Sequence, residues 1–505
     1  MIFMRSNLKI FLLLVLLTFI TYLNILPNNL FFDDEELIYK NTYIQNIKYF
    51  PLLFTENMIA GAGKISNMYR PILMTTFAVD HAFWGNNPFG YHLSSLILHA
   101  ANGILVFYLI NQLFKHQLLS LFTSVMFAVH PIQSEAVSYA SGRTDPLYTF
   151  FFLLSLIFFI KGKSPVAIIF FLLSLLSKET AIILPLILLL IYHLLEKNDK
   201  RKTYKLVLLS ATFISFIYIF LRLTVLNFAN TLNFYQTGNI YSQNLSVRFY
   251  TFTKVFFEYL YLIFYPKELM IARSATVITS ITDLYVLSFI FLFILGLFLS
   301  IKFYKKNPLY LFSFAWFFIT ILPVSGIIPI NNIMAEHYLY LPSLSFFLLI
   351  AKLFTFLWQK FPGHTQRLVI SLLIIAIIIT LSGRTIIRTF DWRNPIIFYT
   401  KSLAQSPENL PMRNNLAMAY SERNMLEEAI REYKATIEIG DIYPNTHHNL
   451  ANVYKQQGKY KEAEEEYLKA LEIDPRFYFS YGGLADLYQI TGDKVKLEKI
   501  LNKIK

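Results

Sequence analysis

The sequence predicts an all-α protein in which a polytopic helical membrane domain is followed by an α-solenoid. The 505 residues are 55% hydrophobic and only 15% charged, whereas soluble domains carry about 25% charged residues. Long apolar runs recur up to about residue 390, and a 34-residue repeat follows them. We therefore predict a membrane domain at 1–390 and a repeat domain at 391–505.

The composition also excludes several classes of protein and site. The chain contains no cysteine, so it has neither a disulfide framework nor a thiolate metal site. The net charge of +13 would point to nucleic acid in a soluble protein. Here the cations cluster between apolar runs, as the positive-inside rule requires, so the expected partner is a lipid bilayer and not nucleic acid. No cofactor is indicated, and a divalent metal is compatible with the sequence without being indicated by it.

The apolar runs predict eleven membrane spans. They lie near 8–26, 92–114, 118–137, 146–161, 164–178, 180–195, 205–226, 283–302, 308–324, 343–358 and 367–383. The first run is too long for a cleaved signal peptide and no small-residue cleavage site follows it, so we expect a retained span. The segment 249–265 is apolar but contains Lys254 and Glu258, which favours an interfacial or re-entrant helix.

The positive charges between spans predict the orientation of the chain. They are Arg5, Lys9, Lys115, Lys161, Lys163, Lys197, Lys200, Arg201, Lys202, Lys205, Lys302, Lys305, Lys306, Lys352, Lys360 and Arg367. With eleven spans, all of these lie on the cytoplasmic side. The amino terminus is then inside, and the carboxyl-terminal domain is on the outer face of what we expect to be a bacterial plasma membrane.

The last 115 residues repeat a pattern every 34 residues. Triplets ending in Leu-Ala begin at Asn415, Asn449 and Gly483, and tyrosines keep the same step at Tyr420, Tyr454 and Tyr488. This is the period of the tetratricopeptide repeat (TPR), a helix–turn–helix unit that must stack to bury its apolar face. Gly458 and Gly492 suit the tight turn inside each unit. We expect about three repeats with a leading half-repeat near Tyr399, the third repeat being truncated.

Charged and polar residues gather where predicted spans reach the outer face. They are Asp33-Asp34, Tyr69-Arg70, Arg143-Thr144-Asp145, Lys178-Glu179 and Glu336-His337. Charges flanked so closely by apolar residues are costly and are usually functional or paired. Arg143 with Asp145, and Lys178 with Glu179, could simply neutralise each other. Because five such sites share one face, we instead predict a single outward cleft.

These residue types suit transfer of a group from a phosphate-bearing lipid. Arg70, Arg143 and Lys178 could bind the phosphate, the arginines through their planar fork. A carboxylate of Asp33 or Asp34 could accept the proton of an attacking hydroxyl. Because phosphate is already a good leaving group, no second carboxylic acid is required, in contrast to glycoside hydrolysis.

Four motifs occur in order along the chain: FFDDEELIYKN, HPIQSEAVSYASGRTD, LLSKETAIILPL and AEHYLYLPSLSF. They resemble the transmembrane-and-TPR protein O-mannosyltransferases and their bacterial relatives, which belong to the GT-C superfamily and use polyprenyl-phosphate sugars. The resemblance covers nearly the whole chain. It implies an inverting hexosyltransferase that moves a mannose-like sugar from a polyprenyl-phosphate donor to a protein hydroxyl on the outer face, with the TPR domain binding the acceptor.

The resemblance also implies roles for individual residues. Asp33 would be the base and Asp34 would position the substrate. The residues expected to bind the donor phosphate and substrate are Arg70, Arg143, Asp145, Lys178, Glu179, Glu336 and His337. Similar asparagines in other TPR glycosyltransferases bind the acceptor backbone, because a carboxamide donates and accepts at once, so Asn415 and Asn449 are the expected acceptor-binding residues. The alternative is that each asparagine only bonds to a neighbouring helix.

Two other functions compete with protein glycosylation. The first is a GT-C enzyme that glycosylates an envelope glycan or lipid. The second is a non-enzymatic membrane scaffold that presents a TPR module to a partner. A scaffold would tolerate Asp33→Asn and Arg143→Ala, whereas an enzyme would not.

Overall fold

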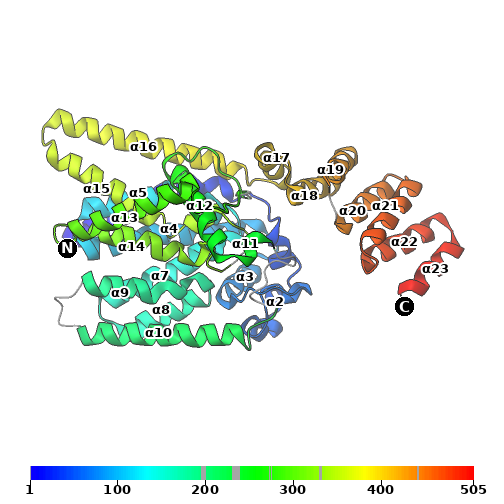
Figure 1. The fold of residues 1–505 in the computed structure, drawn as a ribbon, viewed down its shortest axis with the longest axis horizontal. Helices are drawn as coiled ribbons and strands as arrows, with labels where there is room; N and C mark the ends of the chain where they lie inside the picture. The colour runs from blue at the N-terminus through cyan, green and yellow to red at the C-terminus, as the bar shows by residue number, and fades with distance from the viewer. Residues whose placement is uncertain are drawn as a thin grey trace. The chain divides into compact units, whose positions relative to one another are not determined.

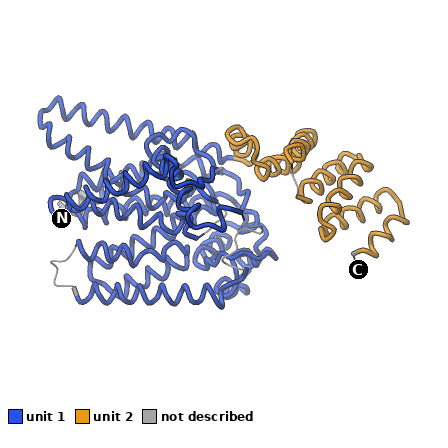
Figure 2. Tube along the Cα trace, viewed as in Figure 1, with its two compact units in different colours: residues 1–393 blue, residues 394–505 orange. Residues whose placement is uncertain are grey.

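Every regular element among the described residues is helical, as the computed structural model in Figure 1 shows. The structure describes residues 2–194, 201–229, 239–271, 273, 276–328, 332–440 and 443–504. The chain divides into two compact units, unit 1 (Met1–Arg393) and unit 2 (Asn394–Lys505), which Figure 2 colours separately. The predicted all-α class, a helical membrane domain followed by a repeat domain, is confirmed.

Unit 1 is a bundle of apolar helices joined by short helical turns. Its helices are α1 (Ile2–Tyr22), α2 (Thr42–Gln45), α3 (Pro71–Trp84), α4 (Pro88–Phe114), α5 (Gln117–Val129), α6 (Ser134–Ser138), α7 (Thr144–Ile160), α8 (Ser164–Leu175), α9 (Leu184–Leu194), α10 (Arg201–Leu223), α11 (Ile240–Gln243), α12 (Leu245–Phe264), α13 (Leu284–Tyr304), α14 (Leu309–Ile321), α15 (Leu344–Lys360) and α16 (His364–Phe390). The short turns are η1 (Leu23–Ile25), η2 (Glu35–Tyr39), η3 (Ile47–Phe54), η4 (Ala60–Ala62), η5 (Pro131–Gln133), η6 (Ser141–Arg143), η7 (Glu179–Ile183), η8 (Leu322–Val324) and η9 (Glu336–Leu339). Helices suit lipid because they satisfy their backbone hydrogen bonds internally.

Six helices in the described part of the chain are long and apolar enough to cross a membrane. They are Leu8–Ile25, Pro88–Phe114, Ser141–Ile160, Lys202–Leu223, Leu284–Tyr304 and His364–Phe390, and shorter apolar helices occur at Gln117–Val129, Ser164–Leu175, Glu179–Leu194 and Leu309–Val324. The count of eleven spans therefore stays a prediction, and α12 is not among the six. Lys197 and Lys200, on which the orientation partly rests, lie outside the described residues, as do the side chains of Arg5 and Arg201.

The predicted span 118–137 is wrong in one respect, because the chain leaves the helix before the predicted end. Helix α5 ends at Val129, and Pro131 begins the separate turn η5. Proline has no N–H to continue the helical ladder. The ring Nδ1 of His130 instead accepts the N–H of Ile132 at 3.2 Å. Glu135 therefore stands on the separate short helix α6.

Unit 1 contains a fully buried arginine between its helices α3, α4 and α7. The Nη1 atom of Arg143 lies 2.6 Å from Asp80 Oδ2. Its Nη2 donates to the Tyr91 carbonyl at 2.6 Å, and its Nε donates to Ser95 Oγ at 3.2 Å. The guanidinium also lies 4.7 Å from the centre of the Phe77 ring. This one side chain therefore joins η6, at the start of α7, to both α3 and α4.

Unit 2 consists of stacked helix pairs. Its helices are α17 (Pro395–Gln405), α18 (Leu410–Ser421), α19 (Leu426–Ile439), α20 (Pro444–Gln456), α21 (Tyr460–Ile473), α22 (Tyr478–Thr491) and α23 (Lys494–Ile504). The turn residues Asn424, Gly458 and Gly492 stand at the same repeat position, and all have positive φ angles, of 59°, 75° and 78°. The third repeat, which we expected to be truncated, contains both of its helices, α22 and α23. Helix α23 has 11 residues, whereas α21, the second helix of the preceding repeat, has 14.

The buried ion pair of Arg143 gives a prediction about stability. Arg143→Ala leaves Asp80 charged and unpaired inside the bundle, so the free energy of unfolding should fall by roughly 3–5 kcal/mol. Joint replacement by Arg143→Met and Asp80→Leu should cost less, because no charge is then left unpaired. Lys40→Ala is the control, because the Lys40 side chain also forms ion pairs but is 55% exposed. Unfolding of the detergent-solubilised proteins measures all three, and equal stability of Arg143→Ala and Lys40→Ala would contradict the prediction.

Candidate active site

The two acids of the FFDD motif face different surroundings. Phe32, immediately before them, has φ of 63°, a conformation that bulky residues rarely adopt and that is common at functional sites. Asp34 is 1% exposed, whereas Asp33 is exposed. The turn at Phe32 is therefore followed by an exposed carboxylate, that of Asp33, and a buried one, that of Asp34.

Asp34 ties the acidic loop to the turn η6. Its Oδ1 accepts the backbone N–H of Ser141 at 2.8 Å and also accepts the Ser141 hydroxyl. Burial raises the pKa of Asp34 to about 7, although the hydrogen bonds from Ser141 act in the opposite direction. Asp34 is thus an internal tether that fixes the position of its neighbour, Asp33.

Asp33 is an accessible carboxylate of the site. Its backbone N–H donates to Tyr139 Oη at 2.9 Å, and the Tyr139 ring stacks on Trp392 with centroids 5.3 Å apart. The protein atoms around the Asp33 side chain desolvate it and raise its pKa above the ordinary value, while the charge of His337 acts to lower it. An accessible carboxylate with a raised pKa suits a proton acceptor.

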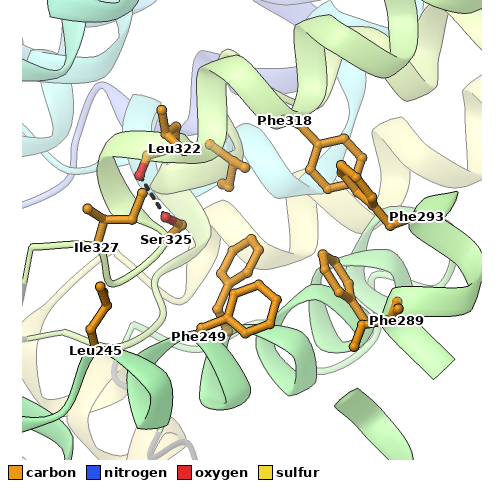
Figure 3. A pocket seen from close by; sticks show the side chains of 11 residues that line it. Leu245, Phe249, Phe289, Phe293, Phe318, Leu322, Ser325 and Ile327 are labelled. Carbon is orange, nitrogen blue, oxygen red and sulfur yellow. Dashed lines mark hydrogen bonds between the residues drawn. The ribbon is translucent and has the colours of Figure 1, made fainter. Parts of the chain in front are cut away.

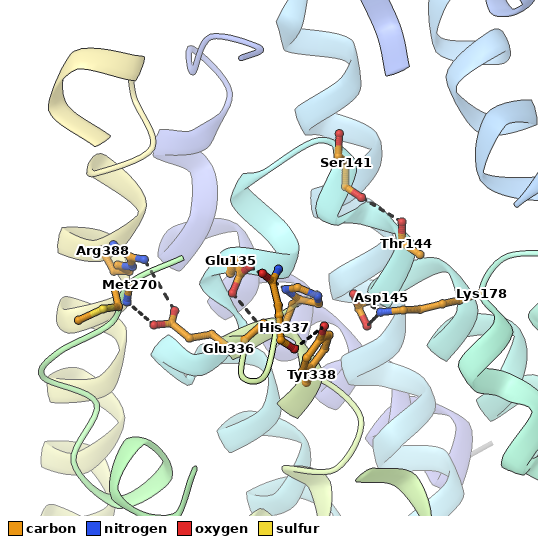
Figure 4. A network of polar contacts seen from close by, with 12 residues as sticks. Glu135, Ser141, Thr144, Asp145, Lys178, Met270, Glu336, His337, Tyr338 and Arg388 are labelled. Atoms are coloured by element: carbon orange, nitrogen blue, oxygen red, sulfur yellow. Dashed lines mark hydrogen bonds and ion pairs between the residues drawn. The ribbon is translucent and has the colours of Figure 1, made fainter. Parts of the chain in front are cut away.

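A glutamate from α6 clasps the histidine of η9. Glu135 Oε1 lies 2.7 Å from His337 Nδ1, and Glu135 Oε2 accepts the His337 backbone N–H at 3.1 Å. The Glu135 side chain is 3% exposed and that of His337 is 24% exposed. Figure 4 shows this pair between Glu336 on one side and Asp145 with Lys178 on the other.

Two further ion pairs lie beside the clasped histidine. Lys178 Nζ is 2.7 and 2.9 Å from the two oxygens of Asp145, and both side chains are nearly buried. Arg70 binds Glu179 through two bonds, Nη2 to Oε1 at 2.6 Å and Nε to Oε2 at 3.0 Å. This is the bidentate geometry in which arginine binds a carboxylate most strongly.

Tyr338 links these pairs to the Glu135–His337 pair. Burial raises the pKa of the Tyr338 phenol, and the negative charges of Glu135 and Asp145 add to the effect. The Lys178 ammonium lies 5.9 Å from the centre of the Tyr338 ring. Tyr338 is therefore within electrostatic reach of both groups, which places them in one neighbourhood.

Glu336 anchors η9 from the opposite side. It is fully buried; its Oε1 accepts the Met270 N–H, and its Oε2 lies 3.7 Å from Arg388 Nη2. Burial raises the pKa of Glu336 to about 7, against the lowering effect of the nearby Arg388 charge. Glu336 therefore contacts protein groups on both of its oxygens.

The structure brings most of the predicted site residues together. Its network includes Asp33, Asp34, Arg70, Asp145, Lys178, Glu179, Glu336 and His337. The proposed neighbours in sequence are not the ion-pair partners: Arg143 pairs with Asp80 instead of Asp145, and Lys178 pairs with Asp145 instead of Glu179. Arg143 is 0% exposed and already bonded, so this geometry does not support its expected contact with phosphate.

Sequence reasoning missed several residues on which the network depends. Asp80 stands as a single acid in the largely apolar run PILMTTFAVDHAFW, and that isolation was a usable signal of a buried partner. Tyr139 and Arg388 carried no comparable signal, because their roles arise from packing between distant segments. Within the described ranges, no group of three or more histidines, aspartates or glutamates is arranged to hold a metal ion.

An apolar pocket of about 560 Å³ lies among α12, α13 and α14 (Figure 3). Its lining residues are Leu245, Phe249, Phe252, Phe289, Ile290, Phe293, Phe318, Ile321, Leu322, Ser325 and Ile327. The one hydroxyl among them, of Ser325, donates to the Leu322 carbonyl at 2.7 Å. The pocket thus presents hydrocarbon surface to any occupant.

Comparisons with known proteins agree with the sequence motifs. The tetratricopeptide repeat model matches residues 444–477. A Caenorhabditis elegans protein O-mannosyl-transferase is 27% identical over 448 residues, covering 86% of this chain and 63% of that protein. The human protein O-mannosyl-transferase TMTC3 is 25% identical over 476 residues, covering 85% of this chain and 51% of its own length. The present chain thus spans about half to two thirds of these relatives.

Among solved structures, the crystal structure of ArnT from Cupriavidus metallidurans bound to undecaprenyl phosphate overlaps with a TM-score of 0.40. It is 14% identical in sequence, and the overlap covers 91% of this chain and 79% of that one. This structural likeness is too weak to bear on function. The sequence relatives are informative: this chain is similar over most of its length to proteins named protein O-mannosyl-transferases, as its motifs predict. Its unit 2 contains a tetratricopeptide repeat.

Proposed function

We propose that this protein is a membrane glycosyltransferase that moves a mannose-like hexose from a polyprenyl-phosphate donor to a protein hydroxyl. The observation that carries the proposal is Asp33, an accessible carboxylate with a raised pKa beside a network of ion pairs. The names of the relatives support the same reaction. The active site lies on the outer face of the membrane in this proposal, as the loop charges predict.

The proposed reaction is a single displacement at the sugar's anomeric carbon. The acceptor oxygen attacks that carbon, Asp33 takes the hydroxyl proton, and the bond from carbon to the phosphate oxygen breaks with its electron pair going to the phosphate. One displacement inverts the configuration of the sugar carbon. Asp34 contributes by holding Asp33 in place through Ser141, so its role is to position the base.

Two of the side chains expected at the donor site are better placed than Lys178 to meet the donor phosphate. The Arg70 side chain is 12% exposed and that of His337 is 24% exposed, whereas Lys178 is 6% exposed. We assign phosphate contact to Arg70 and His337. Glu179, the partner of Arg70, together with the Asp145–Lys178 pair and Glu336, holds the surrounding turns. The apolar pocket of α12, α13 and α14 is the surface that we propose for the isoprenoid chain.

The role of Asp33 predicts a loss of turnover without a loss of folding. Asp33→Asn should lower transfer by roughly 10²–10⁴-fold, the usual contribution of a general base. The assay supplies purified protein with labelled polyprenyl-phosphate hexoses and with protein, glycan or lipid acceptors. Glu35→Gln is the matched control, since this partly exposed carboxylate two residues away pairs with Lys40. Full transfer by Asp33→Asn would rule out the assignment, and label moving only to glycan or lipid would rule out a protein acceptor.

The surroundings of Asp33 predict a pH dependence. A base works only when ionised. The protein atoms around the Asp33 carboxylate partly desolvate it and raise its pKa, so the protonated, inactive form persists to higher pH than for a free carboxyl. The value of kcat/KM should therefore rise with pH, with its midpoint above the ordinary aspartate value of about 3.9. Glu36→Gln should move the midpoint down, because the Glu36 charge adds to the rise. A midpoint at or below that of free aspartate would contradict this account.

The repeat unit yields a prediction about acceptor choice. Asn415 on α18 and Asn449 on α20 are half-buried, and Asn449 also hydrogen-bonds Tyr433 of α19. We propose that both bind the backbone of a protein acceptor. Replacing both with alanine should weaken transfer to protein while sparing a small hydroxyl acceptor, and Asn445→Ala on the exposed start of α20 is the control. Equal losses on both acceptors would show that these asparagines only stabilise the repeats.

A further inference from the structure

The clasp between Glu135 and His337 fixes which ring nitrogen is left for chemistry. Glu135 Oε1 lies 2.7 Å from Nδ1, so Nδ1 carries the hydrogen that points at the carboxylate. The other carboxylate oxygen holds the His337 backbone N–H at 3.1 Å. A histidine held in this way has one tautomer, and Nε2 becomes the nitrogen that can accept or deliver a proton.

The clasp is held from several directions. Glu135 stands on α6, which exists as a separate helix because the chain breaks at Pro131. Glu336, the residue before His337, is fixed to Met270 and faces Arg388. The Tyr338 ring packs edge-on against the imidazole with centroids 4.6 Å apart. The position of the imidazole is therefore set by α6, by η9 and by the loop that contains Met270.

The imidazole also lies near the proposed base. Glu135 on α6 holds His337, and Tyr139 at the carboxyl end of the same five-residue helix accepts the Asp33 N–H. Both the Asp33 and the His337 side chains have accessible surface. In the proposed transfer Asp33 gains a proton, while the leaving phosphate gains an oxyanion. Asp33 must lose that proton before the next turnover, and the phosphate monoester can take one up, since its second pKa lies near neutrality.

We propose that His337 relays the acceptor's proton from Asp33 to the leaving phosphate through its Nε2. Glu135 is the positioning residue, because its bond to Nδ1 leaves Nε2 directed away from the Glu135 carboxylate. The inference rests on the proposed transfer reaction. The acceptor O–H bond breaks, the proton passes to an Asp33 oxygen and then to His337 Nε2, and it ends on a phosphate oxygen of the released polyprenyl phosphate. No oxidant, reductant or further reactant is needed.

A purely structural pair is the competing explanation. Glu135 is buried, and a buried carboxylate requires a partner whether or not it has a chemical role. In that case the only role of His337 would be to pair with the buried Glu135 carboxylate. The two substitutions would then each damage packing independently. The two explanations differ in how the effects of the substitutions combine.

A double-mutant cycle on kcat tests the relay. Glu135→Gln, His337→Gln and the double variant are compared with the wild-type chain, using a labelled polyprenyl-phosphate hexose and a protein acceptor. Each single change should lower kcat about 100-fold, the order expected for lost proton transfer. Glu135→Gln, which leaves the imidazole in place, should change the KM for the donor little. The double variant should be no slower than His337→Gln alone, because positioning is useless once the imidazole is gone. Glu35→Gln, which removes a carboxylate that pairs with the exposed Lys40, should stay near wild type.

Two outcomes of the cycle would overturn the relay. The first is a His337→Gln protein that keeps most of its kcat. The second is a double variant whose loss equals the product of the two single losses. If Glu135→Gln does not fold, His337→Gln still decides the first point, because this side chain is partly exposed.

A chemical measurement separates failure of the relay from failure of the proposed function. Diethyl pyrocarbonate modifies accessible imidazole nitrogens, and mass spectrometry of the His337 peptide measures the rate without any transfer. Added polyprenyl phosphate should slow the modification, and Glu135→Gln should accelerate it by freeing Nδ1. If neither change alters the rate, the relay is wrong even in an active enzyme. If the wild-type chain transfers no sugar, the proposed function fails, whatever the modification rate.

Discussion

Pairing of charges inside an apolar bundle is the constraint on which the rest of unit 1 depends. A charge in such surroundings is costly unless a partner compensates it. Arg143, with no exposed surface, lies against Asp80, and Lys178 lies against Asp145. Each pair joins a turn or helix to another that is distant in sequence, so the requirement for compensation also fixes the packing of the helices.

The same constraint assembles the candidate site. The partners of Glu135 and Glu336 come from α6, η9 and α16, and these pairs hold the turns around Asp33. Asp33 differs from them because its carboxylate remains accessible. A frame of paired charges beside an accessible carboxylate is the arrangement expected of a preorganised catalytic site.

The two units obey different physical rules. In unit 2, the repeat pattern is local, and each helix pair buries small residues such as Ala429 and Ala463 against its neighbours. Such an array can present the same side chain at regular intervals, which suits recognition of an extended backbone. In unit 1, by contrast, the functional groups come from many separate segments, so the chemistry depends on the complete bundle.

The sequence by itself determined the helical class, the apolar spans and the 34-residue repeat, because these depend on local periodicity and on backbone hydrogen bonds closed within each helix. It also predicts that the acids and bases of the site share one face of the membrane. Only the tertiary structure decided which charges pair: Lys178 reaches Asp145 across 33 residues, and His337 reaches Glu135 across 202. It likewise buried the Arg143 guanidinium against Asp80. Partner choice depends on how distant segments approach in space, and local periodicity carries no record of that approach.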